Sequence, residues 1–192
     1  MKVIILGSRG YLGSNLVTEF ENIGSIVLGT DRSTLSFGEG NELAQLRKLI
    51  EDFSPDVIVN ALGKIDTQEA STPLDIFNSI FLPTFLLYSY FCEKNPAHKV
   101  SLLTFGSESE GEPRKNYPVY SAIKTAEATL VKTAVEVFLN TNVSWQRLTI
   151  PRLNGGLGKV GNQPDSHLER KSIEEVWAEV LITLNIRENP GE

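Results

Sequence analysis

The chain of 192 residues is poor in cysteine, histidine and clustered basic side chains. Its only cysteine, Cys92, excludes an internal disulfide and fits a reducing compartment, so we expect a cytoplasmic protein. His98 and His167 are isolated, and no group of cysteines or carboxylates has the spacing of metal ligands, so we expect no metal. The net charge of −6, without a basic cluster, excludes the electrostatic footprint expected of a nucleic-acid-binding protein.

Long apolar runs are also missing. The longest, residues 80–91, is too short to cross a bilayer and is interrupted by Pro83, Thr84 and Ser89, so we expect no membrane partner. Met1 leads directly into an apolar strand, so we expect no signal peptide. Cys92 follows the apolar run and is expected to pack there as a small residue. The length suits one domain with a complete core, which we assign to residues 1–192.

The amino-terminal segment carries the pattern of a dinucleotide-binding loop. Residues 2–6, Lys-Val-Ile-Ile-Leu, predict a buried strand, and three glycines follow before apolar residues recur at helical spacing. Gly7 permits a tight turn, Gly10 lets the backbone approach a pyrophosphate, and Gly13 lets the helix pack close to the strand. The Gly-x-x-Gly-x-x-Gly spacing is not the commoner one, and glycines that merely cap a strand are the alternative. Cofactor contacts are predicted at Gly7, Arg9, Gly10, Tyr11, Leu12 and Gly13.

An acidic residue ends the second predicted strand. Asp31 follows residues 25–30, where a carboxylate would accept hydrogen bonds from the adenosine ribose hydroxyls. It would also repel a 2′-phosphate, which favours NAD as the cofactor. Arg9 and Arg32 are near Asp31 in the sequence and could pair with that phosphate, so NADP stays open.

Strand and helix patterns alternate along the chain. Strands are predicted at 2–6, 25–30, 35–37, 56–60, 99–105 and 142–150, and helices from Leu12 and at 41–52, 72–94, 119–139 and 172–185. Capping boxes begin at Thr72 and Ser172, and Pro83 predicts a bend. The alternation predicts an α/β fold, a doubly wound parallel sheet in a three-layer α/β/α sandwich of the Rossmann type. Ligands of such sheets bind at the carboxyl ends of the strands.

Three polar side chains in the second half suggest chemistry. Tyr120 and Lys124 share a helix face, and Ser107 follows a strand thirteen residues before Tyr120. They supply a proton donor, a cation to tune it and a hydroxyl to orient a carbonyl. Alone, the pair would be read as a packed tyrosine beside a solvated lysine, and Ser107 as a turn residue. The dinucleotide-binding pattern at the amino-terminal end favours the catalytic interpretation of these three residues instead.

These motifs together resemble the short-chain dehydrogenase/reductase family over nearly the whole chain. The glycine loop and residues 54–61, Ser-Pro-Asp-Val-Ile-Val-Asn-Ala, are similar to its extended branch of sugar-nucleotide epimerases and reductases. The resemblance implies that Asn78 steadies its helix and a proton-relay water beside the catalytic Ser107, Tyr120 and Lys124. It also implies cofactor contacts at Asn60, Ala61, Lys124 and Pro151.

The resemblance implies an NAD(P)-dependent oxidoreductase that moves hydride between the nicotinamide and a carbonyl or alcohol carbon. The substrate would be a small carbonyl compound or a sugar nucleotide. A homodimer is expected through the helices near 73–94 and 119–139. The alternative is a non-catalytic dinucleotide sensor or scaffold, which would need only the glycine loop and Asp31.

Three departures from the family pattern affect the substrate end. Arg152 follows Pro151 where the family often has glycine, and Glu108 and Ser109 follow Ser107 where sugar-nucleotide dehydratases have Asp-Glu, which disfavours a dehydratase. About forty residues follow Pro151, so we expect a minimal substrate segment at about 152–171. The chain is then a minimal member, or one that is cut short or completed by a partner.

Overall fold

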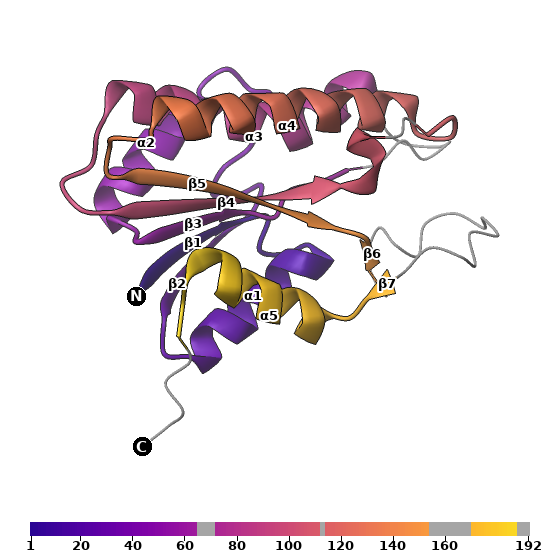
Figure 1. Ribbon diagram of the computed structural model, residues 1–192. Coiled ribbons are helices and arrows are strands. Elements are labelled where there is room, and N and C mark those ends of the chain that lie inside the picture. The colour runs from indigo at the N-terminus through magenta and orange to yellow at the C-terminus, as the bar shows by residue number, and fades with distance from the viewer. Residues whose placement is uncertain (65–71, 112–113, 154–169, 188–192) are drawn as a thin grey trace.

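Five parallel strands form the sheet of the computed structural model, which describes residues 1–64, 72–111, 114–153 and 170–187 (Figure 1). The strand order is β2-β1-β3-β4-β5, and every neighbouring pair is parallel. The strands are β1 (Lys2–Leu6), β2 (Ile26–Thr30), β3 (Val57–Asn60), β4 (Val100–Ser107) and β5 (Val143–Ile150). The chain order reverses between β1 and β3, which is where ligands of open α/β sheets bind.

Helices cover both faces of the sheet, which confirms the predicted three-layer sandwich (Figure 1). On one face lie α1 (Tyr11–Asn22) and α5 (Ile173–Leu184). On the other lie α2 (Glu42–Phe53), α3 (Pro73–Glu93) and α4 (Pro118–Val137). A short 3-10 helix, η1 (Glu108–Glu110), follows β4 directly.

The central strands β1 and β3 have nearly continuous apolar sequences because both of their faces are buried. Ile4, Ile58 and Leu102 belong to the core under α2, α3 and α4. Their neighbours in each strand, such as Val3 and Val57, belong to the core under α1 and α5. The two-residue period of a strand therefore divides one set of apolar side chains between two cores.

The helix starts follow the predicted capping chemistry. Thr72 Oγ1 accepts the N–H of Asp75, and the Asp75 carboxylate accepts the N–H of Thr72. Ser172 and Glu175 make the same reciprocal pair at the start of α5. The α3 helix continues through Pro83 without interruption, and the bend expected there stays a prediction.

By length and composition alone, α3 is apolar enough to cross a membrane. Such a helix is weak evidence for a membrane span, because core helices of water-soluble proteins pass the same test. Here α3 packs between α2 and α4, and Ile80, Leu87 and Phe91 are buried in the fold.

The strand predicted at 35–37 is wrong. The backbone after β2 turns back on itself, since the carbonyl of Asp31 accepts the N–H groups of Thr34 and Leu35. Leu35 is buried and Phe37 packs against the same core, so their apolar character reflects core packing in a loop. The expectation of a packed Cys92 is also wrong, because Cys92 is exposed.

Two short strands mark the ends of the predicted substrate segment. Residues Arg152–Leu153 form β6 and Arg170–Lys171 form β7, and the two pair in parallel. Their pairing brings the two ends of that segment together. Residues 154–169, where most of the predicted segment falls, lie outside the described residues.

The α5 helix should be an integral part of the core. Trp177 is buried and meets Phe20 of α1 edge to face at a centroid distance of 4.9 Å. Replacing Trp177 with alanine should lower the free energy of unfolding by about 3–5 kcal/mol, measured by urea denaturation. Ile182→Ala, on the exposed side of α5, is the control and should change it by less than about 0.5 kcal/mol. Equal effects of both changes would contradict this packing.

Candidate functional site

The glycine loop joins β1 to α1 by a tight turn. Gly7 has a φ of 83°, in the left-handed region that favours glycine, and its carbonyl accepts the N–H of Gly10 at 2.9 Å. A Cβ on Gly13 would lie 2.2 Å from the Gly7 carbonyl oxygen, closer than any real contact. The sequence requires glycine at 13 because the first turn of α1 lies directly on this loop.

Beside this loop, the paired strands β1 and β3 end next to one another. Leu6 and Asn60 are register partners at the ends of these strands, and the N–H of Ala61 bonds the carbonyl of Leu6. The Asn60 side chain turns inward, where its Nδ2 donates to Thr84 Oγ1 at 3.0 Å and its Oδ1 accepts the N–H of Leu62. Asn60 therefore shapes this edge of the sheet while its amide is bound to other protein groups.

Asp31 is held at the end of β2 by its own loop. Its Oδ1 accepts the backbone N–H of Ser33 at 2.7 Å and the Ser33 hydroxyl, and its Oδ2 lies 2.6 Å from an Arg9 nitrogen. The Ser33 hydroxyl and then the Ser33 N–H keep the pKa of Asp31 below its ordinary value. The carboxylate is thus charged and oriented near the glycine loop, while the Arg9 guanidinium is largely exposed.

Ser107 ends β4 and caps η1. Its Oγ accepts the N–H of Ser109 at 3.2 Å, and its own N–H donates to Glu110 Oε1 at 2.6 Å. A serine hydroxyl that accepts one hydrogen bond keeps its own proton to donate. The turn therefore fixes the position of Ser107 and leaves its hydroxyl proton available to donate.

The Lys124 side chain is buried on α4. Its Nζ donates to the carbonyl of Phe105 at 2.8 Å and to Glu127 Oε2 at 2.9 Å. Phe105 lies two residues before Ser107 in β4, so the ammonium group lies under the strand that carries this serine. Tyr120 lies one helical turn before Lys124 and is partly exposed.

The turn that carries Ser107 packs directly on α4. Thr125 Oγ1 donates to the carbonyl of Glu110, and Ser121 Oγ accepts the N–H of Arg114. The fold thus places the Ser107 turn beside the helix that carries Tyr120 and Lys124. Their catalytic roles stay a prediction.

The other predicted residues lie farther from this group. The Asn78 amide lies against Gly38, where a Cβ would be 2.4 Å from its Nδ2. We find no hydrogen bond from Asn78 to Ser107 or Lys124 within the described residues. Pro151 follows β5 and is partly exposed, and Arg32 is exposed after Asp31.

Three charged residues near the site were not predicted from the sequence. Arg147 of β5 lies 2.6 Å from Glu110 Oε1 and 3.1 Å from Glu127 Oε2, both measured from its Nη2. Local spacing could have indicated the two glutamates. Glu127 lies three residues after Lys124 on the same helix face, and Glu110 lies three residues after Ser107, which is the spacing of a capping box. Polar and apolar residues alternate in β5, so the sequence of this strand does not single out Arg147.

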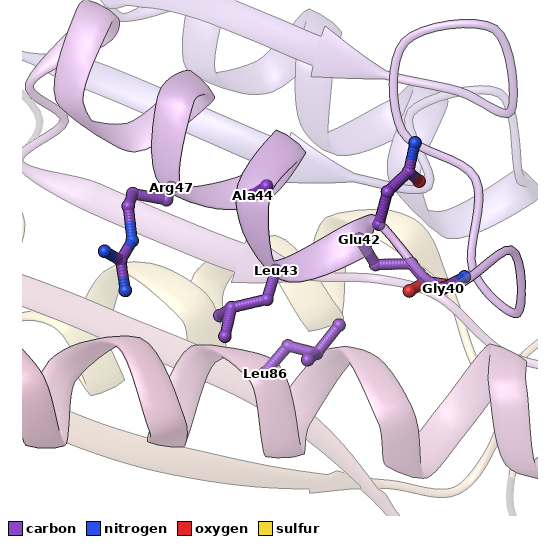
Figure 2. Close-up of a pocket in the computed structure, with 7 residues that line it drawn as sticks. Gly40, Glu42, Leu43, Ala44, Arg47 and Leu86 are labelled. Carbon is purple, nitrogen blue, oxygen red and sulfur yellow. The ribbon is translucent and has the colours of Figure 1, made fainter.

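A separate groove of about 490 Å³ lies between α2 and α3 (Figure 2). In this close-up Leu43 and Leu86 point toward one another across the groove, with Glu42 and Arg47 at its sides. None of the predicted site residues lines it. In the described parts of the chain, no cluster of three histidine, cysteine or acidic residues could hold a metal.

The chain resembles known proteins in family and in fold. The model of the NAD dependent epimerase/dehydratase family matches residues 3–151. No curated protein sequence matches the chain.

Many solved structures resemble the fold. A bulky-bulky ketone specific alcohol dehydrogenase from Comamonas testosteroni has a TM-score of 0.73 and 15% identity, over 96% of this chain and 82% of its own. A 3-ketoacyl-(acyl-carrier-protein) reductase from Brucella melitensis, complexed with NADH, has a TM-score of 0.72 and 17% identity, over 95% of this chain and 90% of its own. A short chain dehydrogenase from Burkholderia cenocepacia J2315, in complex with NADP, has a TM-score of 0.77 and 14% identity, over 96% of this chain and 84% of its own. At these identities the likeness is one of fold.

The contact between Gly13 and the Gly7 carbonyl should tolerate no side chain. Gly13→Ala must push α1 off the loop, so we expect the free energy of unfolding to fall by about 1–3 kcal/mol in urea denaturation. NADH, titrated by its fluorescence, should also bind more weakly than to the wild type. Gly111→Ala is the control, because a Cβ there meets open space and should leave both measurements unchanged. A G13A protein as stable as the wild type would contradict this account.

Proposed function

Because the chain belongs to the NAD dependent epimerase/dehydratase family, we propose that it is an NAD(P)-dependent oxidoreductase that acts through Ser107, Tyr120 and Lys124. The family match agrees with the sequence resemblance to the extended short-chain dehydrogenases/reductases. It runs from the glycine loop to Pro151 and so includes all three residues. The observation that carries the proposal is the packing of the Ser107 turn on α4, beside the carboxyl edge of the sheet.

In the proposed reaction, hydride moves between the nicotinamide and a carbonyl or alcohol carbon of the substrate. Tyr120 donates or accepts the proton of the substrate oxygen, and Ser107 donates a hydrogen bond to the same oxygen. Lys124, one helical turn after Tyr120 on α4, would hold the ribose of the nicotinamide. Asn78 would pass the proton toward solvent through water, which requires its amide to turn away from Gly38.

The cofactor is proposed to be NAD rather than NADP. The charged Asp31 at the end of β2 supports this choice, since it would repel a 2′-phosphate. Arg9 lies beside that carboxylate and supports the opposite choice only if it turns toward the phosphate. The similar structures from Brucella melitensis and Burkholderia cenocepacia hold NADH and NADP respectively, so the fold accommodates both.

The substrate is proposed to be a sugar nucleotide or a smaller carbonyl compound. The epimerase/dehydratase family match supports the sugar nucleotide, and Glu108 and Ser109 after Ser107 disfavour dehydration. The substrate segment would be residues 152–171, with the rest of the chain forming one dinucleotide-binding domain. A single cysteine, with no disulfide to form within the chain, supports a cytoplasmic location.

The alternative is a dinucleotide sensor without chemistry. One observation favours it: Lys124 is already bound to Glu127 and Phe105, which partly withdraws it from a cofactor. A sensor would bind NADH and exchange hydride with no substrate.

Replacing Tyr120 with phenylalanine tests the proposed chemistry. The wild type should bind NADH more tightly than NADPH and oxidise NADH with at least one compound from a panel of sugar nucleotides and small ketones. Tyr120→Phe should lower turnover about 10²–10⁴-fold while leaving NADH affinity nearly unchanged. Tyr117→Phe, a buried tyrosine at the start of the same helix, is the control and should keep its activity. A fully active Y120F protein would refute the assignment, and NADH binding without turnover in the wild type would support the sensor.

We also propose a homodimer through α3 and α4. Phe77 and Phe85 are exposed on α3 and stack on either side of Phe81, and Leu139 is exposed just after α4. The row of three phenylalanine rings on α3 favours burial against a second copy.

Light scattering at micromolar concentration should give the mass of two chains for the wild type. Phe85→Asp should give the mass of one, because the interface would bury an unpaired charge. Ile182→Asp, at an exposed site on α5, is the control and should remain a dimer. A monomeric wild type would refute the dimer.

A further inference from the structure

Four charged side chains form a connected cluster below the carboxyl ends of β4 and β5. Two are cations, Lys124 and Arg147, and two are carboxylates, Glu110 and Glu127. The side chains of Lys124 and Glu127 are 6% and 2% exposed, and those of Arg147 and Glu110 are 13% and 17% exposed. Charges so far from water require partners, and here the two signs balance.

Both oxygens of Glu127 are held. Its Oε1 accepts the hydroxyl of Thr84 at 2.8 Å, while its Oε2 accepts Lys124 at 2.9 Å and Arg147 at 3.1 Å. Thr84 is itself bonded by Asn60 at the end of β3. The carboxylate therefore cannot rotate without breaking contacts to α3 and β5, and it fixes the lysine that it binds.

Arg147 joins this lysine site to the serine turn. One nitrogen, Nη2, lies within hydrogen-bond distance of both Glu127 Oε2 and Glu110 Oε1. The same Glu110 oxygen accepts the N–H of Ser107 at 2.6 Å. A continuous chain of charge-assisted contacts thus runs from Lys124 to Ser107.

Lys124 keeps one donor for a ligand. An ammonium group has three N–H bonds, and two of those of Lys124 point to Glu127 and Phe105. No other partner of Lys124 occurs in the described ranges. Because two of the three N–H bonds are held in fixed directions, the direction of the third N–H bond is fixed as well.

We propose that Glu127 is a positioning residue for Lys124, and that Arg147 couples the position of this lysine to the turn that carries Ser107. The proposal rests on the proposed function, since it assumes that Lys124 meets the cofactor. Glu127 and Arg147 act through Lys124 and Glu110 and touch neither cofactor nor substrate.

A double-mutant cycle on Glu127 and Lys124 tests this role. Glu127→Gln should weaken NADH binding about tenfold, because the lysine loses a charge-assisted bond that directs it. In the Lys124→Met background, the same change should alter NADH affinity less than about twofold, since there is no lysine left to position. Glu136→Gln, on the exposed side of α4, is the control and should change nothing.

Thermal unfolding of the same variants reports on the charge balance without any cofactor. E127Q and K124M each leave the buried cluster with one excess charge, so each should lower the midpoint by about 6–20 °C. The E127Q/K124M double variant restores the balance and should unfold at a higher temperature than K124M. If K124M does not fold, the NADH affinities of E127Q and E127Q/K124M are compared, and they should agree within about threefold.

The outcomes separate the two proposals. A wild type that binds neither NADH nor NADPH refutes the proposed function. A wild type that binds NADH, with E127Q binding it equally well, refutes the positioning role alone. Losses of NADH affinity that simply add in the double variant also refute it, because Glu127 would then act independently of Lys124.

Discussion

Burial of both faces of the parallel sheet is the constraint on which the rest of this structure depends. Covered by α1 and α5 on one side and by α2, α3 and α4 on the other, the central strands β1 and β3 hold almost only apolar side chains. Several polar groups of the candidate site therefore lie at the carboxyl ends of the strands and in the loops that follow them. The glycine loop, Asp31 and Ser107 all lie there.

The same constraint explains the cluster around Lys124. A lysine and an arginine that enter the layer between the sheet and α4 lose their water, so the fold must supply carboxylates to balance them. Glu127 and Glu110 do so, and each also binds a group of the candidate site. Residues that satisfy buried charge and residues that orient the site are, in this protein, the same residues.

The polar groups of the site are held before any ligand binds. Asp31 is bonded by Ser33 and Arg9, Asn60 by Thr84, and Ser107 by Ser109 and Glu110. Such groups lose little conformational entropy when a ligand arrives, but their remaining donors and acceptors are few. These side chains can therefore bind only ligand groups that lie in the directions of their remaining donors and acceptors.

Local patterns in the sequence determined the glycine loop, the two capping boxes, the alternation of strands and helices and the family, because each depends on residues close together in the chain or on a characteristic motif. They failed where an apolar side chain had a use other than the expected one: Leu35 packs into the core from a turn, and Cys92 is exposed at the end of a core helix. The pairs Lys124–Glu127 and Ser107–Glu110 are also local, since each joins residues three apart in the chain. Only the tertiary structure decided that Arg147 lies between the two glutamates, because that contact depends on the pairing of β4 with β5 and on the packing of α4, which no short sequence pattern records.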